Sequence, residues 1–217
     1  MLNYHQHTTR NCKEVVTIKK RVFGFDIDGV LTADDNGTDN IWLTKASEYF
    51  KLPITKQSFY IEDALGVSEQ QADLFFQKVV RSIITNVTIR PYCVQVLSEL
   101  SEIEAEIHLI TARDEKFRDL TENWLAKHKV PYDTLHMSPG SGQKYSKGAK
   151  CVELGVEFFV DDNLENCIDV TNHGVHVVLF EASHNKGRKT NITRVSDWLD
   201  IKDQIHSILR SSSQIAR

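Results

Sequence analysis

The sequence is poor in cysteine, has no long apolar run and carries no excess of positive charge, and each absence excludes a class of protein. Its four cysteines, among 217 residues, form no C-x-x-C pair and therefore indicate neither a zinc ribbon nor a compact disulfide framework. Reduced thiols in a cytoplasmic protein are the simplest interpretation. No run approaches the roughly 18 apolar residues needed to cross a bilayer, and residues 1–16 lack the apolar core of a signal peptide. We therefore expect a cytoplasmic protein without a membrane partner.

The charge balance narrows the range of partners. The chain has 30 Asp and Glu residues against 26 Lys and Arg residues, which gives a net charge of −4. Because proteins that bind nucleic acid polymers usually present a basic face, we expect no such partner. A small phosphorylated metabolite is not excluded, since a local binding site can be positively charged even when the net charge of the chain is negative. The hydrophobic fraction of 41% is also too large for a disordered chain.

Five short apolar runs have the length of strands that are covered on both faces of a sheet. These runs are Val22–Phe25, Ile107–Ile110, Thr134–Met137, Phe158–Val160 and His176–Phe180. From residue 107 onward, helical patterns alternate with them, at Asp114–His128, Lys147–Leu154, Leu164–Thr171 and Ser196–Leu209. This alternation predicts an α/β fold with a doubly wound, Rossmann-like, parallel sheet of five strands.

The stretch between the first two runs is too long for a single crossover. About 80 residues separate Phe25 from Ile107, far more than a crossover needs. Helical patterns occur within this stretch at Ile41–Phe50, Glu69–Ile84 and Pro91–Leu100. We therefore predict a core formed by residues 1–32 and 89–217, and a helical cap formed by residues 33–88 over the carboxyl end of the first strand.

Acidic residues follow two of the predicted strands, and a hydroxyl follows a third. Asp26 and Asp28 come after the first strand, Thr111 after the second, and Asp161 and Asp162 after the fourth. Ligands of an open parallel sheet bind beyond the carboxyl ends of its strands, so we expect these side chains to meet. Each motif alone would equally suit a turn or a helix cap. Together the carboxylates repel one another unless a cation neutralises them, and an all-oxygen site of this kind suits Mg²⁺.

As a set, these residues resemble the four motifs of the haloacid-dehalogenase-like phosphohydrolases. The first motif is D-I-D-G-V-L-T at residues 26–32, and the second is Thr111 within L-I-T-A-R. The third is a lysine at the start of a helix, and the fourth is Asp161-Asp162. The resemblance spans about residues 20–180 and places residues 33–88 where the family carries its first type of cap. Within the family, the motifs look most like the 5′(3′)-deoxyribonucleotidase branch and its bacterial nucleotidase relatives.

The resemblance implies a mechanism and a role for each residue. Asp26 would attack phosphorus and form an aspartyl-phosphate, and Asp28 would act as general acid and then as general base. Thr111 and Ala112 would contact the phosphoryl group. The residues that would hold Mg²⁺ are Asp26, Asp161, Asp162 and, through its backbone carbonyl, Asp28.

The spacing leaves open which lysine supplies the third motif. Lys147 opens the helix that leads into the fourth strand, where the family places this residue, and we prefer it on position alone. Lys150 lies one turn further on and could face the same site to bind the substrate. Lys144 lies in the preceding loop and is expected to point to solvent.

Trp42, Phe59 and Tyr60 are the aromatic residues of the predicted cap that lie nearest its loops. Such residues can stack on a nucleobase, although most aromatic side chains of a small cap form its own core. Arg113, directly after the second strand, suits either contact with a phosphate or pairing with a carboxylate.

The resemblance implies Mg²⁺-dependent hydrolysis of a small phosphorylated metabolite, and we expect this substrate to be a nucleoside 5′-monophosphate. Two alternatives stay open. A sugar-phosphate or other small-metabolite phosphatase would differ only in its cap. A non-catalytic binding module on the same fold is disfavoured, because a pure scaffold has no evident reason to concentrate these carboxylates. The sequence fixes neither the substrate itself nor the oligomeric state.

Overall fold

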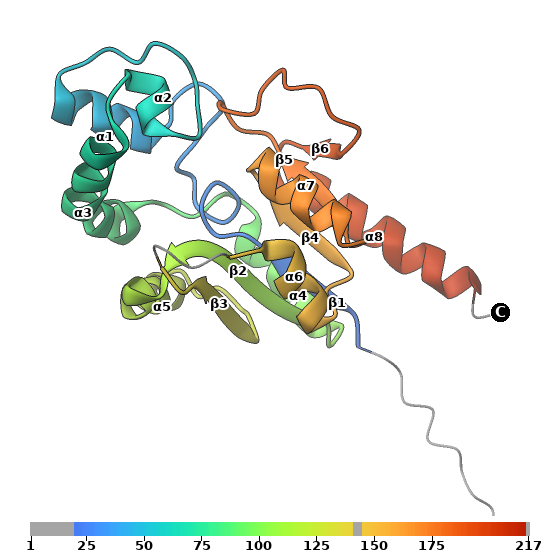
Figure 1. The fold of residues 1–217 in the computed structure, drawn as a ribbon. Helices are drawn as coiled ribbons and strands as arrows, with labels where there is room; N and C mark the ends of the chain where they lie inside the picture. Colours follow the sequence, from blue (N-terminus) through green and yellow to red (C-terminus); the bar gives the residue numbers. More distant parts are fainter. Residues whose placement is uncertain (1–19, 141–144, 216–217) are drawn as a thin grey trace, which may run out of the picture.

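The computed structural model describes residues 20–140 and 145–215, and at its centre lies a parallel sheet with helices on both faces (Figure 1). Within that part of the chain the sheet has six strands in the order β3-β2-β1-β4-β5-β6. Their bounds are β1 Val22–Phe25, β2 Glu106–Asp114, β3 Thr134–Ser138, β4 Phe158–Asp161, β5 His176–Phe180 and β6 Thr193–Val195. The predicted parallel α/β fold and all five predicted strands are confirmed.

Two features of the sheet differ from the prediction. The sixth strand, β6, has three residues, of which only Val195 is buried. It has no apolar run and is a strand because it pairs with β5. The second strand, β2, continues beyond Ile110 to Asp114, which pairs with Ser138 after an irregularity in the register. Residues 111–114 are therefore part of a strand, and the helix expected to begin at Asp114 begins at Arg118, after a short 3₁₀ turn.

The helices on the two faces of the sheet bury separate apolar clusters, because successive strand residues point to opposite faces. Phe23 and Phe25 of β1 belong to one cluster, and Val22 and Phe159 to the other. The helices on the first face are α4 (Cys93–Glu102), α5 (Arg118–Lys127) and α8 (Trp198–Ile215), and those on the second are α6 (Lys147–Leu154) and α7 (Leu164–Asn172). None of the helices in the described residues combines the length and the apolar character needed to cross a membrane.

Three helices lie between β1 and α4, and we call residues 33–88 the helical insertion (Figure 1). Its helices are α1 (Ile41–Phe50), α2 (Ile61–Leu65) and α3 (Glu69–Asn86). They bury a small apolar cluster of their own around Leu43, Ile61 and Phe75. The sequence did not predict α2, because five residues are too few to show a helical period. A capping box between Ser68 and Gln71 begins α3.

The chain enters and leaves the helical insertion at neighbouring points. Thr32 and Ile89 form an antiparallel bridge between the two connections. On the return side, the indole N–H of Trp124 in α5 donates to the carbonyl of Val87 at 2.8 Å. These contacts lie where we predict that core and cap meet, and the division into those two domains stays a prediction.

Candidate active site

The candidate site lies at the carboxyl ends of three adjacent strands, β2, β1 and β4. Asp26 directly follows β1, and its backbone N–H donates to the carbonyl of Val160 in β4 at 2.9 Å. Thr111 lies in β2, and Asp161 is the last residue of β4. All three side chains are buried. The central position of β1 thus brings together residues that lie far apart in the sequence.

Lys147 is the cation at the centre of this group. Its Nζ lies 2.9 Å from Oδ2 of Asp26 and 2.7 Å from Oδ2 of Asp161, and its side chain is only 2% exposed. Lys147 is the first residue of α6, a helix that the side chain of Ser146 caps. The start of α6 therefore places one ammonium group between the acids that follow β1 and β4.

The other lysines considered for this role lie elsewhere. Lys150, also on α6, pairs with Glu153 at 2.6 Å, and both side chains are partly exposed to solvent. Lys144 lies outside the described residues. Gly148 lets α6 pack closely against α7, because a Cβ at that position would lie 2.4 Å from the ring of His173, the C-cap residue of α7. The close packing of α6 against α7 thus fixes the approach of Lys147 to the acids.

Three buried carboxylates are arranged to hold a metal ion. One oxygen each from Asp26, Asp161 and Asp162 lies within 4.8 Å of the other two. Burial raises the pKa of Asp26 to about 7 despite the opposing charge of Lys147, and Asp161 adds to the rise. Burial and the charge of Asp161 raise the pKa of Asp162 well above its usual range. A divalent cation would relieve this cost, and oxygen donors are those that Mg²⁺ prefers.

The formal charges of the site leave room for such a cation. The acids are Asp26, Asp28, Asp161 and Asp162, and the cations paired with them are Lys147 and Arg113. Four negative and two positive charges give a net charge of −2 when all six groups are ionised. Asp34 and Asp35 add two acids nearby and Arg90 adds one cation, so an excess of negative charge remains that a divalent cation such as Mg²⁺ would reduce.

The loop after β1 passes directly against Asp162. Gly29 in this loop has a φ of +74°, and a Cβ there would lie 2.0 Å from Oδ2 of Asp162. Its N–H donates to Oγ1 of Thr32 at 3.0 Å and to Oδ1 of Asp34 at 2.9 Å. Both conformation and space therefore require glycine here, and its absence of a side chain lets the first and fourth motifs approach each other.

Asp28 lies in the same loop and is paired with Arg113. Nε of Arg113 donates to Oδ2 of Asp28 at 2.8 Å, and Nη2 donates to Oδ1 at 2.6 Å. The Arg113 side chain is 4% exposed, whereas that of Asp28 is 31% exposed. Of the two interpretations left open for Arg113, pairing with a carboxylate is the one that the structure displays.

A cavity of about 460 Å³ lies between this edge of the sheet and the helical insertion. The predicted site residues that line it from the sheet side are Asp26, Asp28, Thr111, Ala112 and Asp162. The insertion contributes apolar side chains such as Leu43, Phe76 and Val80 and polar ones such as Asp73 and Gln77. The cavity therefore joins the charged edge of the sheet to a mixed apolar and polar lining from the insertion.

Two of the three aromatic residues considered for substrate contact line this cavity. Trp42 lies in α1, and its Nε1 donates to Oδ2 of Asp34 at 3.0 Å. The ring of Phe59 lies 5.3 Å from that of His184, so it joins the insertion to the core. Tyr60 is not among the lining residues, and its half-exposed ring packs edge-on against Phe59.

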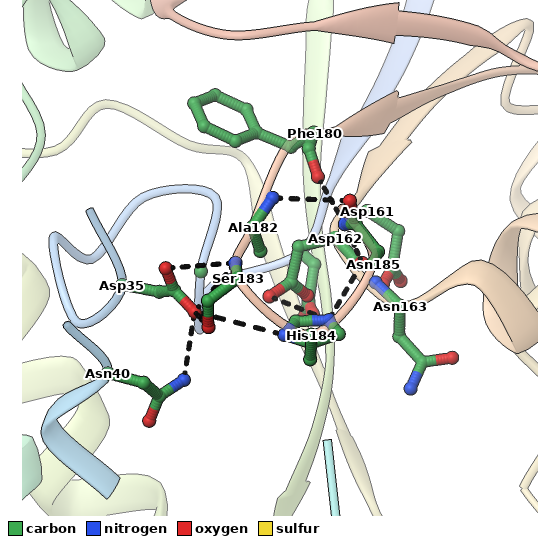
Figure 2. Close-up of polar contacts among 12 residues, drawn as sticks. Asp35, Asn40, Asp161, Asp162, Asn163, Phe180, Ala182, Ser183, His184 and Asn185 are labelled. Carbon is green, nitrogen blue, oxygen red and sulfur yellow. Dashed lines mark hydrogen bonds and ion pairs between the residues drawn. The ribbon is translucent and has the colours of Figure 1, made fainter. Parts of the chain in front are cut away.

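The loop after β5 contributes residues that the sequence did not single out (Figure 2). The backbone carbonyl of Asp162 accepts hydrogen bonds from Nε2 of His184 at 3.0 Å and Nδ2 of Asn185 at 2.7 Å. Burial lowers the pKa of His184, and the ring donates in this way when its proton is on Nε2. The N–H of Ser183 donates to both carboxylate oxygens of Asp35 at 3.1 Å. This loop therefore ties the fourth motif to the chain that follows the first.

The sequence carried a signal for only some of these supporting residues. Asp34 and Asp35 are adjacent acids just after the first motif, and both line the cavity, so they could have been proposed. His184 and Asn185 are single polar residues in a loop. Their contact with Asp162 depends on the order of β4 and β5 in the sheet and on no spacing in the sequence.

Comparisons with known proteins agree with the motifs, although no family model matches the chain. The nucleotidase of Clostridium acetobutylicum is 26% identical over 194 residues, a match that covers 88% of this chain and 96% of the relative. A haloacid-dehalogenase-superfamily hydrolase from Ehrlichia chaffeensis has a TM-score of 0.56 at 14% identity, covering 88% of this chain and 100% of its own. A haloacid-dehalogenase-like hydrolase from Streptococcus pneumoniae has a TM-score of 0.57 at 15% identity, covering 86% and 98%.

At such identities the two solved structures establish the fold, and the curated relative extends the similarity over nearly the whole length of both sequences. The resemblance predicted from the four motifs is therefore confirmed at the level of fold and sequence similarity: the chain has the fold of haloacid-dehalogenase-like hydrolases and is similar in sequence to a nucleotidase.

Proposed function

We propose that the protein is a Mg²⁺-dependent phosphomonoesterase that hydrolyses a nucleoside 5′-monophosphate through an aspartyl-phosphate. The observation that carries the proposal is the buried group of Asp26, Lys147 and Asp161, joined by ion pairs of 2.9 and 2.7 Å beside a large cavity. Burying ionised groups costs free energy. A pure scaffold has no evident reason to concentrate these charges, and a relative named as a nucleotidase supports the same activity.

Asp26 is the nucleophile in this proposal. Its carboxylate oxygen attacks phosphorus in line with the leaving oxygen, whose bond to phosphorus breaks as the aspartyl-phosphate forms. The ammonium of Lys147, 2.9 Å from Asp26, screens the repulsion between two anions. Thr111, which lines the same cavity, offers its hydroxyl to a phosphoryl oxygen. Water then attacks phosphorus, which releases phosphate and regenerates Asp26.

Asp28 supplies the proton transfers. Its carboxyl donates a proton to the leaving alkoxide in the first step and accepts one from water in the second. Among the four acids of the site it is the one with a substantially exposed side chain, and it lines the cavity that would admit the substrate. These properties suit a group that must reach the leaving oxygen, whereas Asp26 must reach phosphorus.

Asp26, Asp161 and Asp162 would hold Mg²⁺, together with the backbone carbonyl of Asp28. The bound ion would neutralise charge on the phosphoryl oxygens. The three carboxylates offer oxygens within 4.8 Å of one another. The hydrogen bonds from His184 and Asn185 to the backbone of Asp162 keep this ligand in place.

The lining of the cavity favours a nucleoside as the leaving group. Trp42 and Phe59 supply aromatic surface on which a base can stack. Leu43, Val80 and Ile84 add apolar surface to the same lining, which suits the faces of a base better than the hydroxyl groups of a sugar.

The test is the release of inorganic phosphate by the full chain from nucleoside 5′-monophosphates, hexose phosphates and p-nitrophenyl phosphate, with Mg²⁺ and with EDTA. We expect the highest kcat/KM for a nucleotide, no turnover in EDTA, and recovery on addition of Mg²⁺. A hexose phosphate that exceeds every nucleotide would favour the sugar-phosphate alternative. Binding of nucleotides without turnover of any ester would favour a non-catalytic module.

A further inference from the structure

We propose that Arg113 is a positioning residue that holds the carboxyl group of Asp28 in the orientation needed for proton transfer to the leaving oxygen. The inference rests on the proposed function, because it assigns Arg113 a part in that reaction. It is carried by the geometry of a bidentate ion pair in which the Arg113 side chain is buried and the Asp28 side chain is partly exposed to the cavity.

The contact between the two side chains fixes both oxygens of Asp28. Nε of Arg113 meets Oδ2 at 2.8 Å and Nη2 meets Oδ1 at 2.6 Å, which is the parallel arrangement of a bidentate pair. Two simultaneous bonds fix the rotation of the carboxyl plane, which a single bond to an ammonium would leave free. Arg113 therefore fixes the orientation in which the Asp28 carboxyl group faces the cavity.

Arg113 is itself held by hydrogen bonds to buried threonine side chains. Its Nη1 lies 3.3 Å from Oγ1 of Thr121 on α5, and its backbone N–H donates to Oγ1 of Thr111 at 3.2 Å. Thr121 is fully buried, so the guanidinium is anchored in the protein interior. The extension of β2 beyond Ile110 is what places Arg113 between α5 and the loop after β1. Asp28 thus takes its orientation from the core of the protein.

The two cations of the site have separate partners. Lys147 contacts Asp26 and Asp161, the acids that follow β1 and β4. Arg113 contacts Asp28. Although burial alone would lower the pKa of Arg113, the Asp28 carboxylate raises it, so the guanidinium stays charged. Arg113 therefore does not supply the proton itself, and although it lines the cavity, its Nε and Nη2 are both bonded to Asp28.

This role has a consequence that depends on the leaving group. When Asp26 attacks phosphorus and the P–O bond of a nucleotide breaks, the alkoxide must take a proton from Asp28, since a free alkoxide is strongly basic. The p-nitrophenolate ion is weakly basic and leaves without that proton. The value of kcat/KM reports only steps up to the first irreversible one, here phosphoryl transfer. The return of a proton from water to Asp28 in the second step therefore does not affect it.

The experiment measures kcat/KM for a nucleoside 5′-monophosphate and for p-nitrophenyl phosphate with full-length Arg113→Ala, Arg113→Lys and Asp28→Asn. The matched control is Arg188→Ala, which removes an exposed arginine paired with Glu165. Since general acid catalysis contributes about 100-fold or more, we expect Arg113→Ala to lower the nucleotide value about 100-fold. The aryl ester should lose less than about 5-fold, Asp28→Asn should show the same contrast, and Arg113→Lys should recover little because it restores one bond of the fork.

Equal losses on the two esters would overturn the proposal, because they would mean that Arg113 only maintains the structure or binds the phosphoryl group. If Arg113→Ala does not fold, as judged by circular dichroism, Arg113→Lys decides the question through the same contrast, since it keeps the buried charge. Failure of the wild-type chain to hydrolyse either ester would instead contradict the proposed function. The two failures are therefore distinguishable.

Discussion

The edge of the sheet and the helical insertion line the same cavity, yet they are built differently. At the edge, Asp26 and Asp161 are buried and held to Lys147 by ion pairs of 2.9 and 2.7 Å. On the insertion side, Phe59 lines the cavity with a side chain that is 46% exposed. The edge offers groups that suit any phosphate monoester, while the insertion offers surface that can tell one leaving group from another. The difference leads us to expect chemistry from the edge and substrate choice from the insertion.

Replacement of the proposed nucleophile gives the largest expected effect. Asp26→Asn keeps the shape of the side chain but cannot form the aspartyl-phosphate, so kcat should fall at least about 1000-fold on every ester. Asp119→Asn, at an exposed position of α5, is the matched control and should retain activity. Turnover within 10-fold of wild type, roughly a 1.4 kcal/mol change, would remove Asp26 from the mechanism.

The two lysines of α6 provide the next comparison. Lys147→Ala should lower kcat/KM about 100-fold or more on both nucleotide and aryl esters, because the nucleophile then faces the phosphate dianion without screening. Lys150→Ala should change kcat/KM by less than about 2-fold, since its ion pair with Glu153 is solvent-exposed. Steady-state kinetics on both esters would check this, and the reverse pattern would make Lys150 the phosphate-binding lysine.

The insertion should affect one substrate more than another. Trp42→Ala or Phe59→Ala should raise KM for the preferred nucleotide by about 5- to 150-fold, the loss of one stacking contact of about 1–3 kcal/mol. Activity on p-nitrophenyl phosphate should fall much less. Tyr60→Ala should have the smallest effect of the three, because Tyr60 does not line the cavity. Equal losses on both esters would mean that these aromatics only hold the insertion together.

The smallest expected effect is on thermal stability and comes from the buried acids of the edge. Burial raises the pKa of Asp26 from 3.8 to about 7, so the folded state holds a proton that the unfolded state releases. This contribution to stability is present at low pH and is lost as the pH rises from about 4 to about 7. In EDTA, Tm should therefore fall between pH 5 and pH 8, and less steeply in Asp26→Asn. Mg²⁺ should raise Tm more at pH 8 than at pH 5, and an equal rise at both would contradict the assigned site.

The fold could be predicted where apolar residues repeat with a clear period. The bounds of β1, β5, α1 and α6 agree with the prediction residue by residue. Segments that tertiary contacts define could not be predicted in this way. The five residues of α2 are too few for a period, and the strand β6 exists because it pairs with β5. The extension of β2 likewise depends on its pairing with β3.

The same distinction applies to the candidate site. Asp26, Thr111 and Asp161 follow apolar strands, so the sequence places them at one edge. The choice between Lys147 and Lys150 depends on which of the two side chains faces the acids. Position in the sequence favours Lys147 but does not decide between them. The contact of Ser183 with Asp35 joins residues 148 positions apart, which no local pattern encodes.

The most direct test of the central claim is to identify the residue that becomes phosphorylated. The full chain would be mixed with a ³²P-labelled nucleoside 5′-monophosphate and Mg²⁺, quenched in acid within a turnover, and digested for peptide analysis. Our account predicts label in the peptide that contains Asp26 and none in Asp26→Asn. Label on another residue, or equal labelling of Asp26→Asn, would contradict it.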